Sequence, residues 1–341
     1  MSNQPPIEVP QGAIRLNTDS QRLEFFAQDR WYEMATENAS IGNRGFRVSG
    51  TGAGATFIES FKITTLGYSH DTGFDLSTSR GAFGCSASRT RAVICGGNAP
   101  GVSNSNDIQY FEMTSLSNTI DFGDLTYNAA EAGAHSNNVR LVVTGAASHE
   151  SNVINFLTVA STGSAQDFGD QANKLSSTTA CGSPTRGLFA GGAIPSVVNI
   201  IEFVTIASTG NSVDFGDLTV ARYSAGSGSN NTRGLFIMGN AGSPTNQVNT
   251  IDFVTISSTG NAQDFGDSNM NDTGGPTQGA GVAASPNRIV FFGGYITGGT
   301  DRTTEMEYVN PTTRGNSTRF GDLETAQNSD GNALSSSHGG L

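Results

Sequence analysis

Residues 183–217 read SPTRGLFAGGAIPSVVNIIEFVTIASTGNSVDFGD, and this stretch decides the fold because most of its pattern recurs along the chain. The tetrad that closes it, Asp-Phe-Gly-Asp, begins at Asp121, Asp167, Asp214 and Asp264, and a variant, Arg-Phe-Gly-Asp, begins at Arg319. The successive spacings are 46, 47, 50 and 55 residues. Such a period indicates a repeat architecture, in which each unit completes its core against its neighbours.

Each unit contains four short segments that are typical of β-strands, here called strands A to D. Strand A is rich in small residues, as in YSAGSGS, and strand B follows a turn, as in SPTRGLFAGG. Strand C is a β-branched and aromatic run such as IDFVTI, and strand D carries the tetrad. Four antiparallel strands per unit predict a propeller blade. A stacked β-solenoid is the rival architecture, but its coils are usually shorter than fifty residues and lack the turns between antiparallel strands that this repeat shows.

Three features of the repeat suggest how neighbouring blades pack. The tetrad phenylalanine is expected to wedge between blades, and the glycine beside it to permit a bulge or a close backbone approach. The phenylalanines are Phe122, Phe168, Phe215, Phe265 and Phe320. The A–B turns place one arginine at an equivalent position, at Arg91, Arg140, Arg186, Arg233 and Arg288.

The ends of the chain predict how the ring closes. Residues 44–79 supply strands B, C and D without a strand A, and the last twelve residues, DGNALSSSHGGL, align with the strand A region at 224–235. We therefore expect the chain from Asp330 onward to complete the first blade. The predicted fold is an all-β, six-bladed propeller of residues 44–341 with a short N-terminal β-hairpin arm, residues 1–43. Its blades are 44–79 with 330–341, 80–129, 130–176, 177–224, 225–274 and 275–329.

The composition argues against several functional classes. The net charge is −12 and no basic cluster occurs, which argues against nucleic acid as a partner. Hydrophobic runs are too short to predict insertion in a membrane, and MSNQPPIEVPQG lacks the features of a secretory signal. Cys85, Cys95 and Cys181 are expected to be reduced and structural, with a Cys85–Cys95 bridge as the alternative.

Sequence variation between the units falls on one face of the predicted ring. The A–B and C–D turns hardly change, whereas the B–C and D–A connections differ in length and content, and they share the opposite face. Loops on a rigid scaffold often carry recognition, although unconstrained drift would give the same pattern. The candidate binding residues in these loops are Asn98, Ser103, Asn104, His149, Ser196, Asn246, Gln247, Tyr295, Asp301 and Arg302.

The N-terminal stretch GAIRLNTDSQRLEFFAQDRWYEM, residues 12–34, predicts two strands, a turn between them and a short third strand. Its candidate anchoring residues are Ile14, Leu16, Phe25, Phe26 and Trp31. These side chains could pack on the propeller or form an intermolecular contact, because a sheet this small gains stability by association.

Two resemblances add to this interpretation. The doublets Gly96-Gly97, Gly191-Gly192 and Gly293-Gly294 resemble those of kelch-type blades, although the Tyr and Trp that normally follow are missing. The pattern TIASTGN…DFGDLT…SPTRGLFAGG, across residues 44–341, resembles kelch-like repeats of virion structural proteins in marine phages, notably cyanophages. The segment from Gly12 to Trp31 resembles a hairpin motif of phage tail-fibre and appendage proteins, with Gln28-Asp29-Arg30 in place of its usual Asp-Gly.

No constellation in the sequence predicts catalysis, a cofactor or a metal site. The four histidines do not repeat, no Cys pair has zinc-site spacing, and the paired carboxylates recur in the four Asp-Phe-Gly-Asp tetrads as turn residues would. Oxygen ligands at these aspartates would suit calcium, but no known calcium loop pattern is present.

The resemblances then imply a non-enzymatic structural component of a phage particle, present in several copies and bound to other virion proteins through the arm. A receptor-binding adhesin for a host glycan or protein is the alternative, and a polysaccharide hydrolase is the second alternative.

Overall fold

The computed structural model describes residues 10–17, 22–27, 30–33, 43–48, 56–99, 101–102, 104–145, 151–242, 247–270, 277–296, 303–325 and 332–341. The chain divides into two compact units, 1–42 and 43–341. The described residues form strands and turns without any helix. The first unit is an antiparallel sheet of three strands, β1 (Ile14–Asn17), β2 (Arg22–Ala27) and β3 (Arg30–Glu33).

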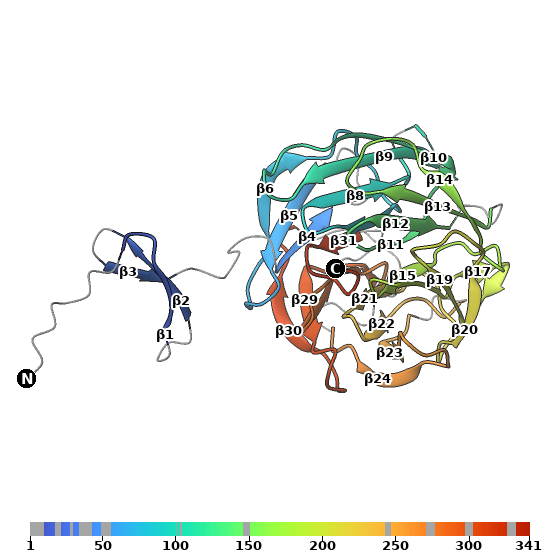
Figure 1. Cartoon of the computed structure of the whole chain (residues 1–341). Helices are drawn as coiled ribbons and strands as arrows, with labels where there is room; N and C mark the ends of the chain where they lie inside the picture. The colour runs from blue at the N-terminus through green and yellow to red at the C-terminus, as the bar shows by residue number, and fades with distance from the viewer. Residues whose placement is uncertain are drawn as a thin grey trace, which may run out of the picture. The chain divides into compact units, whose positions relative to one another are not determined.

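The second unit is a ring of six four-stranded antiparallel sheets, which confirms the predicted six-bladed propeller (Figure 1). From the innermost strand outward, the first three blades are β31 (Asn332–Ser335), β4 (Arg44–Val48), β5 (Phe57–Lys62), β6 (His70–Asp75); β7 (Gly84–Ala87), β8 (Arg91–Cys95), β9 (Ser105–Glu112), β10 (Ile120–Ala129); and β11 (Gly133–Ser136), β12 (Arg140–Thr144), β13 (Val153–Thr158), β14 (Gln166–Asp170).

The other three blades follow the same order of strands A to D. They are β15 (Thr179–Gly182), β16 (Arg186–Ala190), β19 (Ile200–Thr205), β20 (Val213–Asp217); β21 (Gly226–Ser229), β22 (Arg233–Ile237), β23 (Thr250–Thr255), β24 (Gln263–Asp267); and β26 (Gly281–Ala284), β27 (Ile289–Phe292), β29 (Glu305–Val309), β30 (Thr318–Asp322). Two short pairs lie in the connections, β17 (Ala193–Ile194) with β18 (Ser196–Val197) and β25 (Thr277–Gln278) with β28 (Tyr295–Ile296).

The hydrophobic core lies between the blades. The buried apolar side chains fall into six clusters, one for each junction between neighbouring blades in the described part of the ring. At the junction of the fourth and fifth blades, for example, Phe215 of one blade packs with Val254 and Ile256 of the next. The wedge predicted for the tetrad phenylalanine is thereby confirmed, since Phe215 is only 2% exposed.

The tetrad also forms a backbone joint with the next blade. Gly210 donates its N–H to the Phe168 carbonyl (2.7 Å), and Ser212 donates to the Asp170 carbonyl (2.8 Å). Asn211 of the same C–D turn accepts from the Asp170 N–H (3.0 Å). Equivalent backbone bonds recur at the later junctions, for instance from Gly260 to Phe215, so each strand D adds part of its neighbour's turn to its edge.

The repeated arginine is a second link across the junctions. Arg186 donates to the Ile256 carbonyl of the following blade (2.9 Å), while its guanidinium lies 4.7 Å from the Phe203 ring centroid of its own blade. Arg91, Arg140, Arg233 and Arg288 make the same pair of contacts. The sequence predicts that these arginines are equivalent, but only the fold shows to which neighbouring blade each one donates its hydrogen bond.

Serines of the inner strands bridge the strands that line the channel. Ser136 donates to the Ala87 carbonyl (2.7 Å), Ser229 to the Gly182 carbonyl (2.6 Å) and Ser335 to the Ala284 carbonyl (2.6 Å). Each donor and its acceptor belong to adjacent blades. The small, hydroxyl-rich composition of strand A follows from this packing, because inner strands this close leave little room for larger side chains.

The C-terminal strand closes the ring as predicted, with Asn332–Ser335 paired to β4 and Ser335 opposite Gly45. The residues beyond it do not begin a second strand. They turn towards the ring axis, where Figure 1 shows the C-terminus. These residues close one end of the channel.

Deleting residues 330–341 should lower the free energy of unfolding by more than about 4 kcal/mol, because the first blade loses its inner strand and the ring opens. Urea unfolding of the deleted chain against the full chain measures the effect. A chain lacking residues 1–42 is the control and should keep the midpoint of the ring transition. An unchanged midpoint after the C-terminal deletion would contradict closure by β31.

Gly216→Ala should destabilise the ring more than Gly260→Ala does. Both glycines have positive φ, +146° and +153°, so each alanine costs about 1–3 kcal/mol of backbone strain. A Cβ on Gly216 would also lie 2.6 Å from the Gly260 carbonyl, whereas a Cβ on Gly260 meets nothing within 4 Å. Equal losses in thermal unfolding of the two variants would contradict the close approach.

Candidate functional site: the variable face and the channel mouth

Two of the candidate loop residues meet within the second blade. Asn98 forms an antiparallel bridge with Gly81, and its Oδ1 accepts from the Asn104 N–H (3.1 Å). Asn104 itself has a left-handed backbone, with φ +64°. The B–C connection is therefore held to the D–A connection before it, and both lie beside the start of strand A.

Gln247 and Tyr295 are brought together across the fifth and sixth blades. The Gln247 Nε2 donates to the Tyr295 carbonyl (3.1 Å), and Tyr295 pairs with Gln278 in the β25–β28 ribbon. Ser196 is exposed at the start of β18. Ser103, His149, Asn246, Asp301 and Arg302 lie outside the described residues.

In the arm, the register of β1 with β2 places Ile14 opposite Phe25 and Leu16 opposite Leu23. The Ile14 side chain is 63% exposed. Phe26 and Trp31 make an edge-on aromatic contact with ring centroids 5.3 Å apart, and the Arg15 guanidinium lies 4.1 Å from the Trp31 centroid. The arm thus carries one packed aromatic pair on one face of its sheet.

A polar position in strand C, which the motif analysis missed, organises the variable face. Glu202 accepts from Ser212 of its own blade (2.5 Å) and from Asn173 Nδ2 of the preceding blade (2.8 Å), so it holds the D–A connection of that blade. Every blade has a polar residue no more than 2% exposed at this place: Glu59, Gln109, Asn155, Glu202, Asp252 and Glu307. A polar residue at the same place in the strand C run of every blade was the signal that could have revealed this position.

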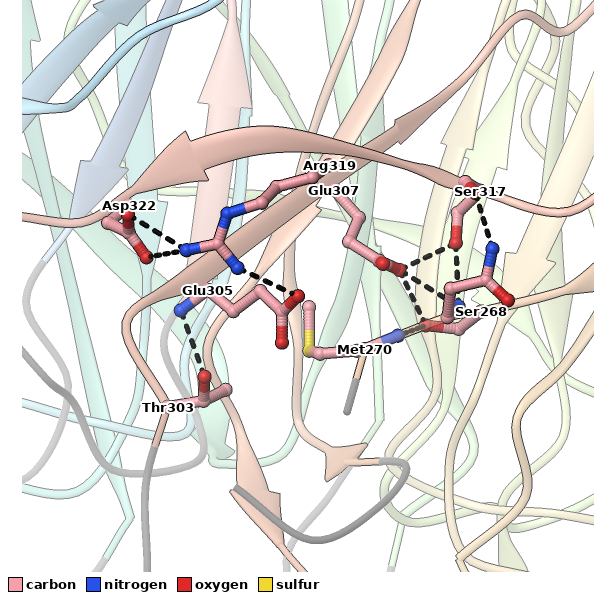
Figure 2. Close-up of polar contacts among 9 residues, drawn as sticks. Ser268, Met270, Thr303, Glu305, Glu307, Ser317, Arg319 and Asp322 are labelled. Carbon is pink, nitrogen blue, oxygen red and sulfur yellow. Dashed lines mark hydrogen bonds and ion pairs between the residues drawn. The ribbon is translucent and has the colours of Figure 1, made fainter. Parts of the chain in front are cut away.

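The sixth blade shows why its tetrad begins with arginine (Figure 2). Arg319 donates to Glu305 (3.2 Å) and to both carboxylate oxygens of Asp322 (2.8 and 3.0 Å). An aspartate there would have faced two other carboxylates. Nearby, Glu307 accepts from Ser317 (2.6 Å) and Ser268 (2.9 Å), while burial raises its pKa above the usual value.

The mouth of the central channel opens among the starts of the inner strands. Ala82, Glu131, Ser177 and Ser224 occupy one equivalent position and all have left-handed φ, between +50° and +55°. Backbone bonds join two pairs of them, from the Glu131 N–H to the Ala82 carbonyl and from the Ser224 N–H to the Ser177 carbonyl (3.0 Å). The Ser177 hydroxyl donates to the Glu131 carboxylate and links the two pairs. They border a chamber of about 110 Å³.

The C-terminal tail closes the opposite end, beside the A–B turns. The His338 Nδ1 accepts from the Gly340 N–H (3.1 Å), so its Nε2 carries the proton and donates to the Ala87 carbonyl (2.6 Å). Ser337 reaches the Ala284 carbonyl (3.3 Å). Gly339 and Gly340 pack so tightly against the Asn230 and Ser136 carbonyls that a Cβ would clash at both positions.

The buried histidines and the buried Cys181 thiol beside the channel are neutral at physiological pH. Burial lowers the pKa of His135 to about 3, helped by nearby His338, and burial lowers the pKa of His338 to about 4, with Arg89 contributing. Burial raises the pKa of Cys181 to about 12. All three cysteines are free thiols, so the predicted reduced state holds and the alternative Cys85–Cys95 bridge is absent.

The polar groups of the variable face and the channel mouth suit binding through hydrogen bonds. Within the described ranges, no three His, Cys, Asp or Glu side chains gather as metal ligands would. In that same part of the chain, no helix has the length and apolarity that crossing a membrane requires. Comparison with known families finds no family model that matches this chain, and comparison with curated proteins finds no match.

Acidification should destabilise the ring through the two channel histidines. Their folded pKa values lie below the ordinary value near 6.5, so the unfolded chain binds more protons as pH falls below 6.5. Stability is lost from there down to about pH 4 for His338 and down to about pH 3 for His135. The slope approaches about 1.4 kcal/mol per pH unit for each histidine.

Urea midpoints between pH 7 and pH 5 measure this slope while most carboxylates stay ionised. His338→Gln should reduce the pH dependence, and His70→Gln, at an exposed position of β6, should leave it unchanged. A slope that is the same in all three proteins would contradict the buried neutral imidazole.

Proposed function

We propose that this protein is a non-enzymatic structural component of a bacteriophage particle, in which the propeller contacts another protein or the host surface through its variable face. The observation that carries the proposal is that the two faces of the ring differ: one holds the joints between blades, and the other holds the connections that vary between repeats. The A–B and C–D turns form joints between blades, as by Arg186 and Asn211, while the ends of the described D–A connections, which differ between repeats, border the channel mouth.

Binding is favoured over hydrolysis by the state of the carboxylates. A glycosidase uses two carboxyl groups that flank the scissile bond and are free to exchange protons. Glu202, Asp252 and Glu307 are instead buried and accept hydrogen bonds that fasten one blade to the next. The phage assignment rests on the resemblance of the repeats and the hairpin, and it implies a particle exposed outside the cell.

The arm is the proposed attachment to other virion proteins. It forms a compact unit of its own, and its small sheet exposes Ile14. Sheets of this size gain stability when they associate. A receptor-binding adhesin for a host glycan or protein is the second candidate, and the chamber that opens on the variable face favours it.

The protein should be found in gradient-purified phage particles, and deletion of residues 1–42 should prevent its incorporation because the attachment is lost. Mass spectrometry of particles that assemble with each variant measures this. Thr209→Ala, in an exposed C–D turn, is the matched control and should be incorporated normally. Absence of the full chain from purified particles would contradict the proposal.

Adsorption competition separates the two candidates. Purified full chain added to host cells before phage should reduce adsorption if the ring binds a receptor, and Tyr295→Ala should weaken that competition. Incorporation into particles without any competition would leave the architectural role.

A further inference from the structure

The tail that follows β31, residues 336–341, is held to the ring differently from the strand before it. β31 is paired along its length with β4, whereas the tail consists of turns. In the described ring, none of the apolar clusters includes a residue of the tail. Ser337 donates to the Ala284 carbonyl over 3.3 Å, and His338 makes the shorter bond, 2.6 Å, to the Ala87 carbonyl. His338 is therefore the main polar anchor of the tail.

Both ring nitrogens of His338 form hydrogen bonds that require a neutral imidazole. Nε2 donates to the Ala87 carbonyl, while Nδ1 accepts from the Gly340 N–H (3.1 Å). A proton added at Nδ1 would face the Gly340 N–H and break the bond that folds the tail back on itself. The tail has little room to rearrange in place, because a Cβ on Gly340 would lie within 3.0 Å of the Ser136 carbonyl and of the His135 ring.

The groups around His338 supply no negative charge from the ring. The His135 ring, on β11, lies edge-on with the ring centroids 5.6 Å apart. Arg89, in the turn after β7, is a nearby positive charge. The α-carboxylate of Leu341 belongs to the tail itself, at a half-buried residue.

The wall that the tail closes is equally poor in anions. An inner chamber of about 50 Å³ lies at this end of the channel, and His338 lines it. Among the described residues that line this chamber, the titratable ones are the two histidines and the thiols of Cys85 and Cys181. Burial raises the pKa of both thiols, so they stay neutral. An imidazolium here would be a buried charge without an ion-pair partner, which is costly in a folded protein.

We propose that residues 336–341 are an acid-operated plug: protonation of the His135–His338 pair expels the tail from the end of the channel, while β31 stays in place and the six blades stay closed. At neutral pH the channel opens at the variable face and is closed beside the A–B turns. In acid it becomes open at both ends. This property belongs to the ring and does not depend on the virion role.

The pKa values give the direction and the size of the effect. Burial lowers the pKa of His338 to about 4 in the docked tail, against about 6.5 for a released histidine. Because the docked pKa is the lower one, docking has its full strength above pH 6.5 and weakens as pH falls towards 4. At pH 5, about one and a half units below the released value, His338 alone weakens docking about thirtyfold. His135, whose pKa is lowered to about 3, adds to this loss.

Hydrogen exchange of the full chain tests the proposal, measured by mass spectrometry at pH 7 and pH 5 with exposure times scaled to the intrinsic exchange rate. The peptide that follows Leu334 should lose at least about thirtyfold of its protection at pH 5, because its amides exchange when the tail is released. Peptides of β12 and β22, buried strands of other blades, should keep their protection.

Three variants separate the plug from a general effect of acid. In His338→Gln the amide can donate to Ala87 and accept from Gly340 but gains no proton, so its tail should lose much less protection at pH 5. His70→Gln, at an exposed position of β6, is the matched control and should show the full loss. Arg89→Gln removes the neighbouring positive charge from an exposed turn, which raises the docked pKa and should reduce the loss. This variant still tests the proposal if glutamine does not hold the tail at pH 7.

Two outcomes would overturn the inference. The first is a tail that is equally protected at pH 7 and pH 5 in the full chain. The second is a loss of protection in β12 and β22 together with the tail, because acid would then open the ring itself and not the plug.

Discussion

The close approach of each tetrad glycine to the neighbouring blade is the constraint on which the rest of the ring depends. Gly216 lies against the Gly260 carbonyl, and the same contact allows Gly260 to donate to the Phe215 carbonyl (2.7 Å). Phe215 can then enter the apolar cluster beyond it. One residue without a side chain thus permits a backbone joint and a buried aromatic ring together.

Polar groups hold the inner and outer parts of the ring in different ways. Near the axis, serines such as Ser136 and Ser229 bond to inner-strand carbonyls of the adjacent blade. Farther out, buried acids such as Glu202 hold the connection from the preceding blade. Most of these polar groups are therefore satisfied within the protein, and they join the blades as well as filling their own hydrogen-bonding capacity.

Part of the candidate site could be predicted from the sequence. The contrast between constant turns and varying connections identified the face on which the chamber opens, and Gln247 and Tyr295, chosen from different repeats, do meet there. The residues at the channel mouth, such as Glu131 and Ser177, were not predicted, because each stands at a D–A connection with no distinguishing motif. Their roles depend on a left-handed backbone and on contacts with other blades, which a repeat alignment does not reveal.

The sequence by itself determined the repeat, the six blades, the closing strand and the wedge phenylalanines, because each follows from local alternation and from a period that recurs along the chain. Only the tertiary structure decided that the last residues close one end of the channel and that the strand C acids hydrogen-bond the connection from the preceding blade. It also decided that residues at the channel mouth have left-handed backbone angles. These properties arise between atoms of different blades, and their geometry depends on how six similar units meet around one axis.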